Sequence, residues 1–233
     1  MNIQQMHIEF REASDRLDSS AFADLLPEQT DYILNEAIQR YTKQKYEKFE
    51  IEQRSTEDLK NLIVTEFPTI TTIVTETNVY KADLSNRFTN EALATASTTI
   101  YWYWLRGRAR IVKTGCISKY VGIKIYSHDD LNEVLEDPFK KPYLNEVVGY
   151  FEAGNLYVVT DSSFTIDRVK LSFNKKPTEV RYGSIYPTPV SNIDCDLSDQ
   201  THKEIIQMAV IILLEYLESQ RLQTAIGIKQ VTD

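Results

Sequence analysis

Histidine is the side chain best suited to acid–base chemistry and metal binding near neutral pH, and it occurs three times, at His7, His128 and His202. The three histidines lie in separate segments, and none has the HExxH or related spacing of a metal centre. His202 falls in the first turn of a predicted helix, where a solvated side chain is the usual arrangement. We therefore expect no histidine to be catalytic or to bind a metal.

A second group with chemical potential is "HDD", in which Asp129 and Asp130 follow His128. These residue types can hold a cation, but acidic side chains are equally typical of a helix start, where they complement the helix dipole. We favour the helix start. The sequence contains no GxSxG, Walker A or GxGxxG pattern. It therefore predicts a protein that is not an enzyme and that carries no metal or cofactor.

The stretch "YWYWLRGRAR" combines aromatic and cationic side chains. Strand alternation would place five of them on one face, provided that Gly107 does not break the register. These are Trp102, Trp104, Arg106, Arg108 and Arg110. Such a strip suits nucleic-acid contact through charge and stacking, or a protein interface with aromatic and arginine anchors. A solvated hairpin with one half-buried aromatic pair is the third interpretation, and all three stay open.

The composition limits the function further. The chain of 233 residues has a net charge of -8, which argues against a protein that coats nucleic acid, though not against one that DNA passes without binding. Its first residues do not resemble a signal peptide, and its longest apolar run is shorter than the roughly 20 residues of a membrane span. Cys116 and Cys195 are expected to be structural thiols in a reducing compartment, with a disulfide between them left open.

The residue pattern predicts two kinds of secondary structure in two regions of the chain. Apolar residues recur at helical spacing up to about residue 66, whereas β-branched and aromatic runs with short turns dominate residues 67–195. Near the end, "MAVIILLEYL" is too short to span a membrane and is apolar nearly all round, which is typical of a buried core helix. Thr201 and Glu204 form a capping-box pattern ahead of it. Its predicted core residues are Ile205, Ile206, Ala209, Val210, Ile212, Leu213 and Leu214.

The predicted fold class is α+β, a helical bundle formed by the N- and C-terminal helices with an inserted antiparallel β-rich domain. The predicted helical domain comprises residues 1–66 plus 196–222, and the predicted β-rich domain residues 67–195. Residues 223–233 are predicted to form an extended C-terminal arm. In that arm Ile226 and Ile228 flank Gly227 and suit strand addition to a neighbouring subunit, although a frayed helix end is the alternative.

Four blocks of the sequence resemble ring or head–tail adaptor proteins of crAss-like and other short-tailed phages. The first spans residues 8–50, and the second is "QRSTEDLKNLIV", with Glu57 where such proteins more usually have Asp. The third spans residues 131–160. The fourth, residues 193–221, is similar to the pattern C-x-L-x-x-x-x-H-x-E-I-I-x-x-A-V. The blocks stand in the expected order, and residues 68–125 are the least matched.

The resemblance implies a non-enzymatic virion protein of the portal–tail junction, assembled in the host cytoplasm and needing no cofactor. Its implied partners are further copies in a homo-oligomeric ring, often of about twelve subunits with heterologous contacts. The other implied partners are the portal protein, other tail and ring proteins, and packaged DNA, which passes through without sequence-specific contact. The alternative is a monomeric glycan- or nucleic-acid-binding module that uses the strip from Trp102 to Arg110.

Overall fold

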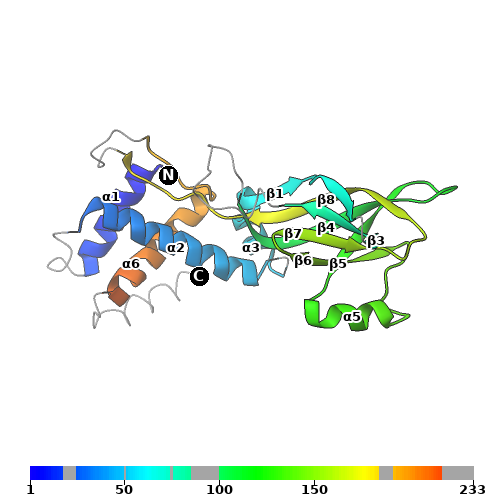
Figure 1. Cartoon of the computed structure of the whole chain (residues 1–233). Coiled ribbons are helices and arrows are strands. Elements are labelled where there is room, and N and C mark those ends of the chain that lie inside the picture. The colour runs from blue at the N-terminus through cyan, green and yellow to red at the C-terminus, as the bar shows by residue number, and fades with distance from the viewer. Residues whose placement is uncertain (18–24, 50, 74–75, 85–99, 184–190, 217–233) are drawn as a thin grey trace. The chain divides into compact units, whose positions relative to one another are not determined.

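The computed structural model describes residues 1–17, 25–49, 51–73, 76–84, 100–183 and 191–216 (Figure 1). The chain divides into two compact units. The helical unit comprises Met1–Leu62 and Pro177–Asp233, and the sheet unit comprises Ile63–Lys176. Each unit has its own hydrophobic core, so each is described by itself.

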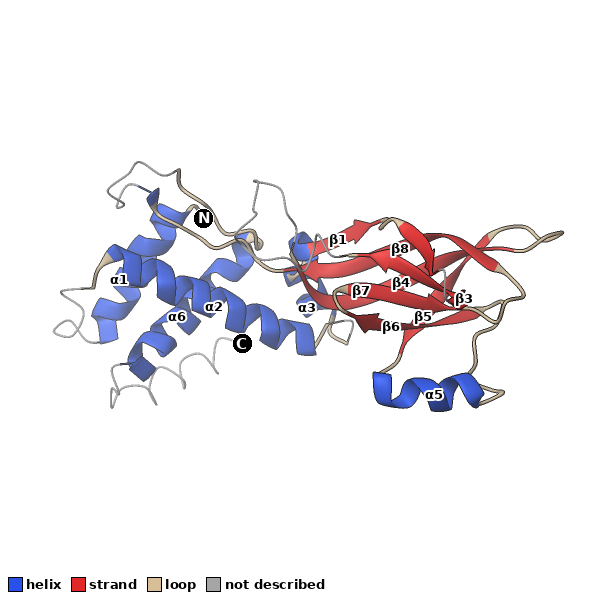
Figure 2. Cartoon of the chain, in the orientation of Figure 1, coloured by secondary structure: helices blue, strands red, loops and turns tan. Residues whose placement is uncertain are grey.

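The helical unit is built from helices, which Figure 2 colours blue. They are α1 (Ile3–Leu17), α2 (Pro27–Glu47), α3 (Gln53–Asp58), the 3₁₀ turn η1 (Lys60–Leu62), the 3₁₀ turn η4 (Asp199–Thr201) and α6 (His202–Tyr216). Helix α2 starts at a proline, which lacks the amide hydrogen that a first helical turn would leave unpaired. The Gln29 side chain accepts a hydrogen bond from the Leu26 amide at 3.0 Å and secures this start.

Helix α6 lies at the centre of the helical core, because it packs against both α1 and α2. Its apolar circumference is therefore covered by protein: Ile205, Ile206, Ala209, Val210, Ile212, Leu213 and Leu214 are all buried. The predicted capping box does not form. The Thr201 hydroxyl donates to the carbonyl of Ser198 at 2.8 Å, and the Glu204 carboxylate is bound by Lys45 and Arg54 instead.

Residues 177–183 and 191–196 belong to the helical unit, although the sequence analysis predicted most of them to lie in the β-rich domain. Side chains of the helices satisfy the backbone of this segment. Asn35 accepts from the Val180 amide at 2.7 Å and donates to its carbonyl at 3.0 Å. Asp31 accepts from the Tyr182 amide at 3.1 Å. Because these groups replace a neighbouring strand, the segment belongs to the helical unit.

The sheet unit holds eight strands in its described part. They are β1 (Ile63–Glu66), β2 (Ile70–Ile73), β3 (Glu76–Asp83), β4 (Tyr101–Val112), β5 (Lys119–Ile125), β6 (Glu146–Glu152), β7 (Asn155–Val159) and β8 (Thr165–Lys175). Their order is β1-β8-β4-β5-β6-β7-β3-β2. All neighbours are antiparallel except β5 and β6, which are parallel and joined through α5 (His128–Glu136). Ser127 caps α5 by accepting a hydrogen bond from the Asp130 amide at 3.3 Å.

The sheet curls until β2 approaches β8, and its inner face encloses the second core. Fully buried members of that core include Ala82, Val147, Leu156, Val158, Val169, Leu171 and Phe173. Alternate residues point to the outer face. Helix α5 lies on the outer side, because the His128 ring meets the edge of the Tyr150 ring, and Tyr150 alternates with the core residue Phe151.

The predicted fold class, a terminal helical bundle with an inserted antiparallel domain, is wrong. The protein is an α+β protein whose main feature is a large curled sheet of eight strands, accompanied by five α-helices in the described part of the chain (Figure 2). The sheet is mixed rather than antiparallel, and α5 belongs to the sheet unit. Pairing between distant strands decides these features, and local periodicity carries no signal for it.

Candidate binding face of the sheet

Strand β4 changes the face it presents part way along its length. Trp104 pairs with Phe173 and Gly107 with Leu171, and the register shifts between Trp104 and Arg106. Leu105 is thus the extra residue of a β-bulge. Since Phe173 and Leu171 are fully buried, Trp104 and Gly107 both face the core.

Trp104 and Gly107 fit together on this inner face. A methyl group at Gly107 would overlap the Trp104 ring, with Cζ2 only 2.9 Å from the position of the added carbon. The Trp104 ring also meets Phe151 edge-on, with ring centroids 5.4 Å apart. The glycine therefore leaves the space that the indole fills.

The predicted strip from Trp102 to Arg110 is not formed as one face. The bulge turns Trp104 inward, while the arginines after it point outward. A further register shift follows Tyr101, and Trp102 stacks on Tyr103 with ring centroids 4.8 Å apart. The sequence allowed for a break at Gly107, whereas the break lies at Leu105.

The arginines of β4 remain on the outer face of the sheet, where residues of the neighbouring strands β8 and β5 adjoin them. Lys170 of β8 stands opposite Arg108, and Arg168 stands opposite Arg110. From β5, Gly122 stands opposite Arg108 and Tyr120 opposite Arg110. We call this surface the cationic face and define it by Arg106, Arg108, Arg110, Tyr120, Gly122, Arg168 and Lys170. Sequence reasoning missed the β8 and β5 members, although "DRVKLS" does alternate cations with apolar residues.

Most of these cations have no acidic partner. Arg110 pairs with Asp167 at 3.2 Å. Within the residues that the structure describes, Arg106, Arg108, Arg168 and Lys170 make no ion pair or hydrogen bond through their side chains, and all four are exposed. Like charges directly opposite one another destabilise a sheet. The cationic face therefore weakens the fold locally instead of supporting it.

A shallow hollow lies beside this face, lined among others by Arg106, Arg108, Lys119, Tyr120, Gly122 and Asn145. A carbon added at Gly122 would meet nothing within 4 Å, so the floor of the hollow is open. The charge of the whole chain is also divided unevenly. The helical unit has 12 Lys and Arg against 21 Asp and Glu, a net of -9, whereas the sheet unit has 14 against 13, a net of +1.

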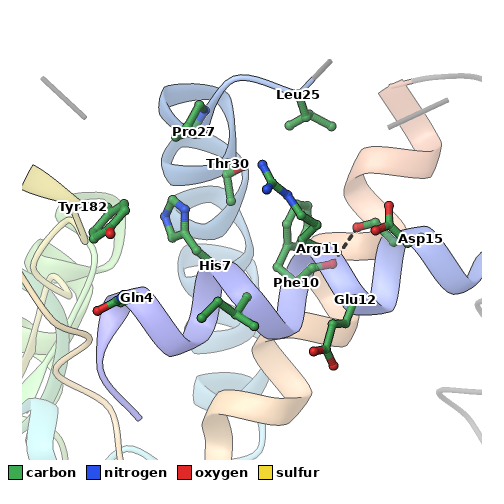
Figure 3. Close-up of a pocket in the computed structure, with 12 residues that line it drawn as sticks. Gln4, His7, Phe10, Arg11, Glu12, Asp15, Leu25, Pro27, Thr30 and Tyr182 are labelled. Atoms are coloured by element: carbon green, nitrogen blue, oxygen red, sulfur yellow. Dashed lines mark hydrogen bonds between the residues drawn. The ribbon is translucent and has the colours of Figure 1, made fainter. Parts of the chain in front are cut away.

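The helical unit contains a separate pocket of about 340 Å³ between α1, the start of α2 and Tyr182 (Figure 3). His7 lines this pocket, and its Nε2 lies 2.7 Å from Oδ1 of the buried Asp31, while its ring lies 5.3 Å from that of Tyr182. Asp31 also accepts a hydrogen bond from the Tyr182 amide, so it joins α1, α2 and residues 177–183. The Ser14 hydroxyl donates to the Phe10 carbonyl of its own helix at 2.7 Å. These contacts are typical of packing rather than of an activated nucleophile.

The other predicted positions are accounted for as follows. His128 bonds the Phe151 carbonyl at 2.8 Å, and His202 bonds the Leu197 carbonyl at 3.2 Å. The expectation of a solvated His202 is wrong: it is 1% exposed, and burial lowers its pKa. Cys116 and Cys195 are both free thiols. Ile226 and Ile228 lie outside the described residues.

In the described ranges no three His, Cys, Asp or Glu side chains are placed to hold a metal ion. Nor does any helix in this part of the chain have the length and apolar character needed to cross a membrane. Comparison with known proteins adds no assignment: no protein-family model matches the chain, and no curated protein matches it.

Proposed function

We propose that the protein is a structural component of a tailed-phage virion, a ring or adaptor subunit of the portal–tail junction without enzymatic activity. The proposal rests on the four ordered sequence blocks that resemble such adaptors. These blocks are packing patterns rather than catalytic motifs. Their value therefore depends on whether their residues build a common core.

The observation that carries the proposal is that three of the four blocks meet at Lys45. This first-block residue places Nζ 3.2 Å from Asp58 in the second block. It places the same atom 3.2 Å from Glu204 in the fourth block. The third block contributes much of α5, β6 and β7 in the sheet unit. Residues of three blocks therefore contact one another in the helical unit. We expect such contacts if the blocks resemble those adaptors because they build the same fold.

In the proposed role, copies form a homo-oligomeric ring that contacts the portal protein and the next tail component. Each copy presents one surface to a different surface of its neighbour, as closed rings require. The acidic helical unit would keep DNA from adhering to the wall of the conduit, because like charges repel. Assembly would take place in the host cytoplasm.

The alternative, a monomeric binding module built on the strip from Trp102 to Arg110, is weakened by the inward position of Trp104. Its cationic part persists as the cationic face of β8, β4 and β5. A glycan ligand is less favoured, because Trp104, one of the two tryptophans of the predicted strip, packs against Phe151 instead of facing outward.

The decisive experiment is mass spectrometry of purified virions of the phage that encodes this chain, with the copy number measured relative to the portal protein. We expect the chain to be present at a fixed ratio to the portal protein, and gold-labelled antibody to mark the head–tail junction. Absence from virions that contain all other tail proteins would reject the proposal. A monomer in isolation would not, because such subunits assemble on their neighbours.

A further inference from the structure

We propose that the cationic face formed by β8, β4 and β5 binds the phosphate backbone of nucleic acid without reading its sequence. The inference starts from unpaired charges in the sheet unit and does not depend on the proposed function. It differs from the strip predicted from sequence, because its extra cations come from β8 and its exposed aromatic residue from β5.

The cationic face is destabilised by repulsion between its own charges. Arg108 and Lys170 stand directly opposite each other, and Arg110 and Arg168 are the next such pair. Each pair places like charges side by side, which costs stability. In the described part of the chain only Arg110 among these four has an acidic neighbour, Asp167. An external anion would remove this repulsion, and the relief would contribute favourably to the free energy of binding.

The cations of this face form two parallel rows. Arg106, Arg108 and Arg110 occupy alternate positions of β4, and the repeat along a strand is about 6.8 Å for two residues. Arg168 and Lys170 form a second row on β8, about 4.8 Å away in the direction of the hydrogen bonds. One small anion would engage one or two of these groups. Two parallel rows of cations therefore suit an extended polyanion.

The residue types of the cationic face favour nucleic acid over an acidic protein surface. The centre of a protein interface is apolar and is depleted of charged residues other than occasional arginine anchors. The paired positions of this face carry Arg, Lys, Ser, Gly and Tyr, with no aliphatic side chain. Arginine forks match phosphate oxygens in pairs. Tyr120, with 43% of its surface exposed, can stack on a base irrespective of its identity.

The number of phosphates that the cationic face can neutralise predicts how strongly such binding responds to salt. Neutralising about four phosphates gives a slope of about -3.6 in a plot of log K against log salt for duplex DNA. The excess of acidic residues in the helical unit repels nucleic acid from that part of the chain. Binding should therefore be confined to the cationic face and should weaken steeply with salt.

The test measures fluorescence anisotropy of a labelled 30-base-pair duplex and a labelled oligothymidine as the full-length protein is added, between about 25 and 200 mM NaCl. We expect salt-sensitive binding that Arg108→Glu/Lys170→Glu weakens at least tenfold. Arg108→Ala should lower the duplex salt slope by about 1. The matched control, Lys43→Glu/Lys141→Glu, changes the net charge equally at two exposed lysines outside the face and should retain binding.

The variants can be checked for folding independently. Both tryptophans of the chain, Trp102 and Trp104, lie on β4, so their fluorescence reports the sheet unit. Arg108→Glu/Lys170→Glu replaces two opposed cations by two opposed carboxylates, so the repulsion across this pair stays about the same and the sheet should remain intact. Absence of binding to both probes, or equal loss in the control pair, would overturn the proposal. So would self-association that the double variant abolishes in the absence of nucleic acid binding, since that would assign the face to a protein contact. Absence of the chain from virions would reject only the adaptor role.

Discussion

The ammonium group of Lys45 lies 3.2 Å from Oδ2 of Asp58, a carboxylate only 2% exposed. The same ammonium is 3.2 Å from Glu204, so one cation joins α2, α3 and α6. The Tyr41 hydroxyl donates to Asp58 at 3.2 Å, and burial together with Glu204 and Asp58 raises the pKa of Tyr41. Burial opposes ionisation of Glu204, but Lys45 and Arg54 outweigh it and lower the pKa of Glu204.

Removing the cation from this network should be costly. Lys45→Met keeps the apolar stem but leaves Asp58 and Glu204 without their shared partner, so we expect a loss of about 3–5 kcal/mol in the free energy of unfolding. Urea unfolding followed by circular dichroism at 222 nm measures it. Lys43→Met, at an exposed position of the same helix, should change stability by no more than about 0.5 kcal/mol. Equal effects would show that the network contributes little.

The core position of α6 is tested at Leu213, which is 4% exposed. Leu213→Ala should lower the free energy of unfolding by about 2–5 kcal/mol, through lost burial and the cavity left behind. Leu213→Asp should leave the protein insoluble or unfolded, because nothing compensates a buried charge. Ile211→Ala, at a partly buried site of the same helix, should cost less. A soluble, folded Leu213→Asp protein would contradict the packing described.

The fit between Trp104 and Gly107 predicts contrasting effects at two glycines of the sheet. Gly107→Ala should destabilise the sheet unit by about 1–3 kcal/mol, because the new methyl group overlaps the indole ring. Gly122→Ala meets nothing within 4 Å and should be neutral or slightly stabilising. Unfolding followed by tryptophan fluorescence reports this unit directly. A neutral Gly107→Ala variant would place Trp104 elsewhere.

Burial of His202 predicts a pH dependence of stability. Burial lowers its pKa in the folded state, with the nearby N-terminal ammonium acting in the same direction. The unfolded chain then binds more protons as the pH falls below about 6.5, so stability is fully present above that pH and declines below it. His202→Gln should reduce the change in unfolding free energy between pH 7.5 and 5.5, while His128→Gln should not. An unchanged slope in His202→Gln would assign the dependence to other groups.

The two cysteines should differ sharply in reactivity. Cys116 is exposed, whereas burial raises the pKa of the Cys195 thiol to about 11 and keeps its reactive thiolate scarce at pH 8. Brief treatment of the native protein with iodoacetamide should label Cys116 alone, and unfolding in urea should expose both. Peptide mass spectrometry distinguishes the sites. Rapid labelling of native Cys195 would contradict its burial.

Local signals predicted the elements that depend on neighbouring residues. The apolar run of α6 identified a buried helix, because a helix without a polar face must be covered on all sides. The acidic residues after Ser127 identified the start of α5, where a hydroxyl cap and the helix dipole act within one turn. The histidine and aspartates there are ordinary helix-start residues, as expected.

Local sequence patterns gave wrong predictions where a side chain contacts a group that the pattern does not include. Thr201 and Glu204 have the spacing of a capping box, but Lys45 and Arg54 bind the carboxylate more strongly than a backbone amide would. His202 appeared to be a solvated first-turn residue, yet it is buried beside the carbonyl of Leu197. In both cases the competing partner is supplied by the tertiary fold.

The sequence by itself determined which parts of the chain are helical and which are rich in strands, and also the buried character of α6, because both follow from residue type and short-range periodicity. Only the tertiary structure decided the order of the strands, the bulge at Leu105 and the meeting of Arg108 with Lys170. These depend on register between segments some sixty residues apart, and a shift of one residue moves every side chain to the opposite face. The cationic face exists for that reason.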